Sequence, residues 1–293
     1  MNMLILVAST FLMGSSFVAG KVLLQEGFPA LLLVGWRFFA AALATLPLLR
    51  LEEIRPRALG VRGAALVALI GLLQTAAVMG LLFLAMRTIP ASTAAILLFT
   101  NPIWVAVLGA VFLGEALTAG RMAGLVLGLA GVALALGIGP DLFAGGDAAT
   151  GELIGLGSSL CWAAATLVTK RAGLPIGAWA LTFWQMLVGA LALLVLAYGL
   201  GQHWPDHVSA AQWGWFAWLS VPASTGSFGL WFMALRRNGA TRASGFLFLA
   251  PLFTVILSYF VLGAPLSWSQ AAGGALIGLA LWLVNRTQAP PSR

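Results

Sequence analysis

Charged residues are scarce in this chain of 293 residues, since Asp, Glu, Lys and Arg together make up only 8% of it. Soluble globular proteins carry roughly 25% charged residues, because a water-facing surface requires them. Hydrophobic residues instead make up 61% of the chain, and its mean hydropathy is +1.01. The composition excludes a water-soluble domain and predicts a protein whose main solvent is lipid.

Acidic residues are fewer than basic residues, with 8 Asp and Glu against 15 Lys and Arg. The basic residues lie at the ends of apolar runs and form no cluster, so we expect no nucleic-acid partner.

Cysteine is nearly absent from the chain. Cys161 is the single cysteine, which excludes an intramolecular disulfide, and no Cys/His group has the spacing of a metal site. We expect no metal, no cofactor and no catalytic residues. An intramembrane enzyme is the weaker alternative, because no Ser–His or paired-Asp arrangement lies at membrane depth.

Apolar runs long enough to cross a bilayer recur along the chain. A membrane-spanning helix needs about 20 mostly apolar residues. Because backbone groups in lipid must find their hydrogen bonds within the segment, such runs predict α-helices. We therefore predict an all-α membrane protein with ten transmembrane helices, at 3–24, 29–49, 63–86, 91–113, 119–139, 151–171, 176–200, 212–236, 241–262 and 267–286.

Lys and Arg are unequally divided between the two sets of predicted loops. With the N-terminus in the cytoplasm, the loops and tail on that side hold twelve basic residues, whereas Arg87 is the only one in the opposite loops. Cytoplasmic loops of membrane proteins are enriched in Lys and Arg. We therefore predict a multi-pass protein of the cell inner (plasma) membrane with both termini in the cytoplasm.

The second half of the chain repeats the first at a constant offset of 149 residues. Pro102 pairs with Pro251 and Arg87 with Arg236, and 15 of the 49 positions in 83–131 are identical to their partners. A constant register over this length, with matched Pro and Arg, indicates an internal duplication.

The two repeats are predicted to cover residues 1–143 and 150–288, with five spans in each. Because five is odd, the second repeat begins on the opposite side of the membrane, and the two have inverted topology. Inverted repeats are the recurring architecture of secondary transporters, whose substrate site lies near the bilayer midplane between the repeats. A duplicated membrane scaffold without transport activity is the alternative.

Charge is nearly absent from the middle of the predicted spans, where each charged group costs about 2.5–3.5 kcal/mol or more. No Asp or Glu lies there, which argues against a proton-coupled exporter of cationic drugs. Arg37, in the second span, is the exception. It is a candidate anchor for a substrate carboxylate or phosphate. The alternative is that it pairs with backbone carbonyls or extends toward the outer surface.

Two prolines lie near the centres of the fourth and ninth predicted spans. Pro102 and Pro251 lack a backbone N–H and are expected to kink their helices, which frees the carbonyls of Leu98 and Leu247. Asn101 adds a side-chain amide beside the first kink. We expect these acceptors to meet an ammonium group, and the alternative is a packing kink that neighbouring helices satisfy.

Weakly polar side chains mixed with Met, Trp and Phe recur on several predicted helices. Such a mixture suits a small neutral or zwitterionic substrate with an apolar side chain, although hydroxyls also hold helices together. The candidate substrate-binding residues are Trp162, Met79, Asn101, Gln74, Thr166, Ser244, Phe248, Trp231, Leu98 and Leu247.

Three stretches resemble a known family: GSSFVAGK in the first span, WRFFAAAL in the second, and the proline-centred segment that ends in FLGEALT. With the two predicted repeats, the chain resembles the EamA family of the drug/metabolite transporter superfamily, and the YddG-type amino-acid exporters within it. The resemblance implies a basket of ten helices with a central cavity. It also implies export of amino acids, aromatic ones especially, or related metabolites by alternating access. Ala264, where the first repeat has Glu115, and Met13, where the family often has Trp, depart from the pattern.

We therefore expect a uniport-like exporter of amino acids or related small metabolites. A carrier of anionic metabolites, such as sugar phosphates or nucleotide sugars, is the alternative; its site requires two or more cavity cations, and Arg37 is the one good candidate. The expected partners are the lipid bilayer and a small-molecule substrate. A monomer is sufficient, because one chain holds both repeats.

Overall fold

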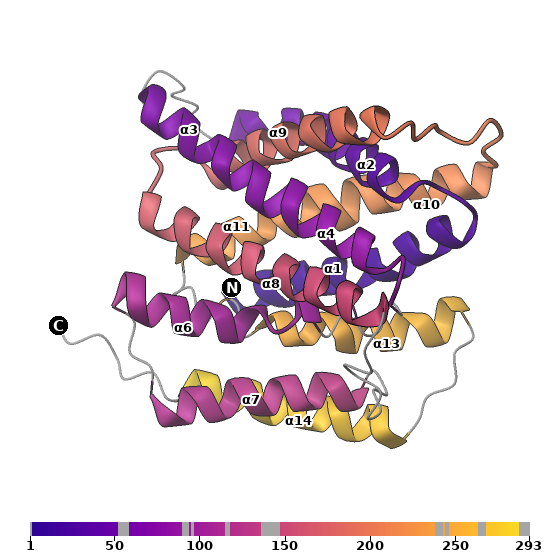
Figure 1. Ribbon diagram of the computed structural model, residues 1–293. Helices are drawn as coiled ribbons and strands as arrows, with labels where there is room; N and C mark the ends of the chain where they lie inside the picture. Colours follow the sequence, from indigo (N-terminus) through magenta and orange to yellow (C-terminus); the bar gives the residue numbers. More distant parts are fainter. Residues whose placement is uncertain are drawn as a thin grey trace.

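The computed structural model describes residues 2–51, 59–89, 94, 97–114, 118–135, 147–237, 243, 246–262 and 268–286. These residues form a bundle of helices, and none of them lies in a β-strand (Figure 1). The predicted all-α class is therefore confirmed.

Helices occupy the middle of every predicted span that the structure describes. The first half of the chain holds α1 (Asn2–Gln25), α2 (Ala30–Thr45) with the 3-10 turn η1 (Leu46–Leu51), α3 (Gly60–Gly71), the π turn η3 (Leu72–Ala77), α4 (Val78–Ala85), α6 (Asn101–Leu113) and α7 (Ala119–Ala135). The second half holds α8 (Asp147–Ala172), α9 (Ala178–Gly199), α10 (Ala210–Ser220), the π turn η4 (Val221–Gly226), α11 (Ser227–Arg237), the 3-10 turn η5 (Phe246–Phe248), α13 (Leu249–Leu262) and α14 (Trp268–Arg286).

Among the described residues, five helical runs are long and apolar enough to cross a bilayer by themselves. Shorter apolar helices, such as Asn101–Leu113, lie beside them. The count of ten spans and the opposite orientation of the two halves stay predictions. The five long runs are Met3–Gln25, Ala30–Arg50, Gly60–Ala85, Ala149–Ala172 and Ala178–Gly199.

The helices pair in a pattern that repeats between the halves of the chain. The offset of 149 residues relates α1 to α8, α2 to α9, α4 to α11, α6 to α13 and α7 to α14. α1 packs on α11 and α13, while its counterpart α8 packs on α4 and α6. α2 packs on its own counterpart α9, and α7 on its counterpart α14 at one edge of the bundle (Figure 1). The core therefore lies where α1, α2, α4, α8, α9 and α11 meet.

Two buried serine hydroxyls make equivalent hydrogen bonds across this core. Ser9 Oγ donates to the carbonyl of Ser227 at 2.8 Å, and Ser158 Oγ donates to the carbonyl of Val78 at 2.7 Å. Both the donors and the acceptors are 149 residues apart. Each bond ties the first helix of one half to a helix of the other half. The duplication seen in the sequence therefore extends to the contacts between helices.

Two π turns interrupt otherwise continuous helices at equivalent positions. η3 spans Leu72–Ala77 and η4 spans Val221–Gly226, again 149 residues apart. A π turn widens a helix by one residue and commonly marks a functional site. Thr75 in η3 and Ser224 in η4 are both buried. The wider turns therefore bring polar side chains to the centre of the bundle.

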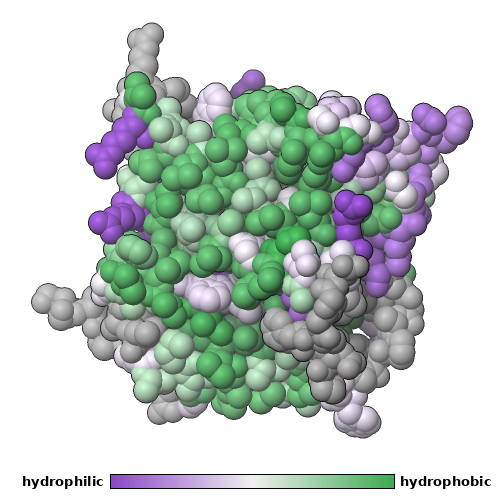
Figure 2. Space-filling view, in the orientation of Figure 1, coloured by the Kyte–Doolittle hydropathy of each residue, from purple (hydrophilic) through white to green (hydrophobic). Residues whose placement is uncertain are grey.

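The outer surface of the bundle is largely apolar. Figure 2 shows hydrophobic residues across the middle of one face and hydrophilic residues gathered toward its two sides. Val195 is 75% exposed, and Phe260 is exposed to the same extent. Extended exposed apolar patches on a monomer mark surfaces that contact a membrane or another protein. The surface fits a lipid-facing band between two polar rims.

Candidate functional site

A central cavity lies between α1, α2, α4, α8 and α11. Helices from both halves of the chain contribute to its wall, and most of the contributed side chains are apolar. The residues that line this cavity are Met13, Ser16, Phe17, Gly20, Lys21, Arg37, Met79, Leu82, Phe83, Met86, Leu98, Phe99, Trp162, Ala223, Ser227 and Phe228.

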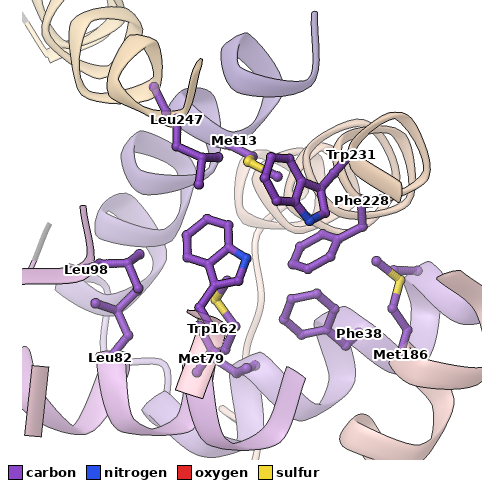
Figure 3. Packing of buried hydrophobic residues seen from close by; sticks show 14 of the residues in the cluster. Met13, Phe38, Met79, Leu82, Leu98, Trp162, Met186, Phe228, Trp231 and Leu247 are labelled. Carbon is purple, nitrogen blue, oxygen red and sulfur yellow. The ribbon is translucent and has the colours of Figure 1, made fainter. Parts of the chain in front are cut away.

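An aromatic cluster forms one side of the cavity (Figure 3). The rings of Trp162 and Trp231 meet edge to face with centroids 6.1 Å apart, and those of Phe38 and Phe228 do so at 5.6 Å. Figure 3 shows the ring nitrogens of both indoles on the sides that face Phe228. Neither Nε1 has a hydrogen-bond partner, although both are buried. Because buried indole N–H groups usually find a partner, the N–H of Trp162, which lines the cavity, is available to a bound molecule.

Arg37 is the buried cation of the cavity wall. Only 2% of its surface is exposed, and its Nε donates to Ser224 Oγ at 2.7 Å. The hydroxyl of Ser224 donates in turn to the carbonyl of Leu219 at 2.7 Å, so the π turn holds it in place. The guanidinium carbon of Arg37 lies 4.7 Å from the ring centroid of Phe38. None of the lining residues that the structure describes is Asp or Glu, so these residues supply Arg37 with no counter-charge.

The two ends of the bundle differ in how tightly they are closed. At the end that carries Lys170 and Arg236, here called the Arg236 end, Lys170 Nζ donates to the carbonyl of Leu235 at 2.9 Å. Arg236 donates to the carbonyl of Ile176. A hollow at this end, lined by these four residues among others, shares no lining residue with the central cavity. These cation–carbonyl contacts seal the Arg236 end.

The opposite end, here called the Arg87 end, carries the counterparts Lys21 and Arg87. Among the described residues, neither side chain makes a hydrogen bond or an ion pair of this kind. Lys21 is instead exposed and lines the cavity. A vestibule lined partly by Arg87 shares Phe83 and Met86 with the central cavity. The cavity therefore adjoins the vestibule at the Arg87 end, with Phe83 and Met86 between the two spaces.

The cavity is contracted in this conformation. The space inside it that water-sized molecules can occupy is about 30 Å³, against about 630 Å³ in the vestibule. Roughly 10–15 Å³ of such space holds one water molecule. A substrate larger than a few waters therefore requires side chains such as Phe83 and Met86, which separate the two spaces, to move.

The predicted substrate-binding residues fall into three groups. Arg37, Met79, Leu98 and Trp162 line the cavity. Ser244 lies outside the described residues. The remaining predicted residues are buried but do not line the cavity, namely Gln74, Asn101, Thr166, Trp231, Leu247 and Phe248. Of these, Trp231 packs on the lining residue Trp162.

Pro102, Pro251 and Asn101 lie at or near the starts of α6 and α13. Pro102 lies in the first turn of α6, and Pro251 is the third residue of α13, so neither lies in the middle of a continuous helix. A proline is tolerated in the first turn, where its missing N–H has no partner in the helix anyway. Asn101 turns toward α8, where its Nδ2 lies 3.5 Å from the carbonyl of Ser159. It does not line the cavity.

Several lining residues were not among the candidates, namely Phe17, Lys21, Phe83, Met86, Phe99 and Phe228. The repeat contains a signal for three of them, because Lys21, Phe83 and Phe99 are identical to their partners Lys170, Phe232 and Phe248. Within the described part of the chain, no group of three or more His, Cys, Asp or Glu residues could hold a metal ion. The cavity therefore offers aromatic rings, thioethers and two cations.

A multi-pass helical membrane protein with a central cavity that is sealed from one end and adjoins a vestibule at the other belongs to the class of membrane transporters. The comparison with known proteins supports this class. The chain belongs to the EamA-like transporter family, whose sequence profile matches residues 1–137 and again residues 149–286.

Relatives of similar length are also transporters by name. The uncharacterized transporter YoaV of Bacillus subtilis is 27% identical over 288 residues, which cover 96% of this chain and 95% of that protein. The uncharacterized transporter sll0355 of Synechocystis sp. is 26% identical over 305 residues, which cover 97% and 90%. One solved crystal structure matches with a TM-score of 0.81 at 19% identity and covers 97% of both chains, which shows a shared fold.

Proposed function

We propose that this chain is a secondary transporter of the inner membrane that exports amino acids, apolar and aromatic ones favoured, or related small metabolites. This is the activity of a YddG-type exporter. The observation that carries the proposal is the cavity itself, which is lined by both halves of the chain and by aromatic rings such as Trp162 and Phe228. Apolar walls with a few placed polar groups are typical of sites for small organic ligands.

Alternating access follows if the two halves exchange the contacts that seal the bundle. Lys170 and Arg236 close the Arg236 end, which the charge distribution predicts to be cytoplasmic. In the opposite state, their counterparts Lys21 and Arg87 would close the Arg87 end. Inverted repeats give the two states similar energies, because each half adopts the conformation of the other. One chain holds all of these groups, so a monomer is sufficient.

Export of anionic metabolites such as sugar phosphates is the second candidate. One observation favours this function: Lys21 lines the cavity together with Arg37. Lys21 is exposed, however, and Arg37 is the buried cation of the two. A doubly charged phosphate on a sugar with many hydroxyls requires more donors than this largely apolar wall offers. We therefore rank this function below amino-acid export.

Counterflow of labelled L-phenylalanine in proteoliposomes tests the proposal. Trp162→Ala removes an aromatic wall of the cavity and should lower the flux about tenfold, which corresponds to about 1.4 kcal/mol. Trp184→Ala is the matched control, because Trp184 is 42% exposed on α9 and does not line the cavity. Equal flux in both variants would contradict the assigned site. Inhibition by phosphate esters but not by amino acids would favour the second candidate.

A further inference from the structure

We propose that Arg37 and the indole N–H group of Trp162, on which Trp231 packs, form a binding site for a carboxylate. This inference rests on the proposed transport function and specifies its substrates. They carry a free carboxylate on an apolar or aromatic body, and their amino group is dispensable. Aromatic carboxylic acids without an amine should then bind and be transported about as well as aromatic amino acids.

The guanidinium of Arg37 carries the first part of the argument. Its Nε is occupied by Ser224, but a guanidinium has five N–H donors. Among the residues that the structure describes, Arg37 makes no other hydrogen bond and no ion pair. A buried charge without a partner is costly, whereas a carboxylate accepts two parallel N–H bonds from one guanidinium. Arg37 lines the cavity, so a carboxylate there would satisfy it.

The two indoles add donors of the same kind. Trp162 Nε1 and Trp231 Nε1 are buried and have no hydrogen-bond partner. Their ring nitrogens lie toward Phe228, whose ring packs on Phe38, and Phe38 in turn contacts the guanidinium of Arg37 (Figure 3). Arg37, Trp162 and Phe228 all line the cavity. The unsatisfied donors of Arg37 and Trp162 therefore belong to its wall, whereas Trp231 packs on Trp162 without lining it.

Acceptors for an ammonium group are scarce by comparison. None of the lining residues is Asp or Glu. The hydroxyls of Ser16 and Ser227, which also line the cavity, donate to helix carbonyls at 2.7 Å and 2.6 Å, respectively, so their oxygens are neutral acceptors without a negative charge. A wall with unused donors and no carboxylate recognises the acid end of an amino acid better than its amine end.

The rest of the wall selects the body of the substrate. Met13, Met79, Phe17 and Phe99 present thioethers and aromatic rings, which adapt to an apolar group of variable shape. Lys21 is exposed where the cavity meets the Arg87 end, so it attracts an anion toward Arg37. A second buried cation, which a phosphate dianion requires, is missing from the lining residues.

The test compares acid and ester as ligands of the full-length protein. Purified protein is titrated with 3-phenylpropionate, L-phenylalanine methyl ester and phenyl phosphate while thermal unfolding is followed. The same compounds compete with labelled L-phenylalanine and labelled 3-phenylpropionate for uptake into proteoliposomes. We expect 3-phenylpropionate to bind and compete about as well as L-phenylalanine, and the ester about tenfold more weakly.

Variants show whether Arg37 causes this preference. Arg37→Gln should bring the ratio of acid to ester potency close to one, Arg37→Lys should keep part of it, and the exposed Arg62→Gln should leave it unchanged. A purely structural Arg37 would lower total uptake in Arg37→Gln without changing the ratio. Trp162→Phe keeps the ring, removes the N–H and should weaken the acid about threefold but not the ester. This variant keeps the test valid if Arg37→Gln does not fold.

The outcomes separate the two proposals. Uptake in which the ester competes as well as the acid overturns the carboxylate site and leaves the transport function standing. Preferred competition by phenyl phosphate also overturns it. Absence of saturable uptake of both labelled compounds, without a thermal shift by either, overturns the site and the proposed function together.

Discussion

Replacing Lys170 by methionine should open the sealed end of the bundle. Methionine keeps most of the apolar stem of Lys170 but removes the Nζ donor that lies 2.9 Å from the carbonyl of Leu235. A hydrogen bond from a charged donor contributes about 1.5–3 kcal/mol. Lys170 is only half-buried, so we take the lower value, and about 1.4 kcal/mol shifts an equilibrium tenfold. The state open at the Arg236 end should therefore become about tenfold more populated.

Cysteine accessibility measures this shift. In a Cys161→Ser background, Ala165→Cys introduces the only cysteine of the chain. Ala165 is fully buried, and it lies 149 residues after Ser16, which lines the cavity. Alternating access therefore predicts that position 165 faces the cavity when the Arg236 end opens. Labelling by an impermeant maleimide from that side should rise about tenfold in Lys170→Met.

Lys21→Met is a control that should change the labelling of Ala165→Cys in the opposite direction. Lys21 is the counterpart of Lys170 and makes no such contact in this state, so its replacement should destabilise only the other state. Labelling of Ala165→Cys should then fall. Shifts in the same direction for Lys170→Met and Lys21→Met, or no shift in either, would refute the exchange of contacts between the halves.

Two further predictions concern packing and pH. A Cβ at Gly189 would lie 2.7 Å from the carbonyl oxygen of Gly71. Gly189→Ala should therefore lower the free energy of unfolding by about 1–3 kcal/mol, measured by thermal unfolding. Gly199→Ala is the control: a Cβ there has nothing within 4 Å, so the free energy of unfolding should change by less than about 1 kcal/mol. Equal melting of these two variants would contradict the close approach of α3 and α9. No His, Asp, Glu or Cys is among the lining residues, so flux at a fixed substrate gradient should change less than about twofold between about pH 6 and pH 8. Flux that follows an imposed proton gradient would argue against uniport.

The helices were predictable because the bilayer leaves the backbone few choices. An apolar run in lipid must satisfy its own N–H and C=O groups, so length and hydropathy suffice to predict a span. α1, for example, was predicted at 3–24 and spans Asn2–Gln25. In the fourth span the sequence predicted a kink at Pro102, and the structure places Pro102 in the first turn of α6. Local sequence does not say whether a proline kinks a helix or begins one.

The candidate site was predictable only in part. Arg37 drew attention because it is the charge in the middle of a span, and Trp162 and Met79 because of their residue types. Asn101 and Gln74 had equally suitable chemistry, yet they are buried away from the cavity wall. Whether a side chain reaches a cavity depends on how each helix is rotated against its neighbours. That rotation is set by packing from several helices at once.

The sequence by itself determined that this is a helical membrane protein with a duplicated chain and one buried cation. These properties follow from hydropathy, a constant register and the cost of charge in lipid, which act on each segment separately. Only the tertiary structure decided which end is sealed, because Lys170 and Lys21 are the same residue in equivalent sequence positions. Two equivalent halves differ in contacts only when the chain occupies one of its conformations, and a linear sequence does not encode that choice.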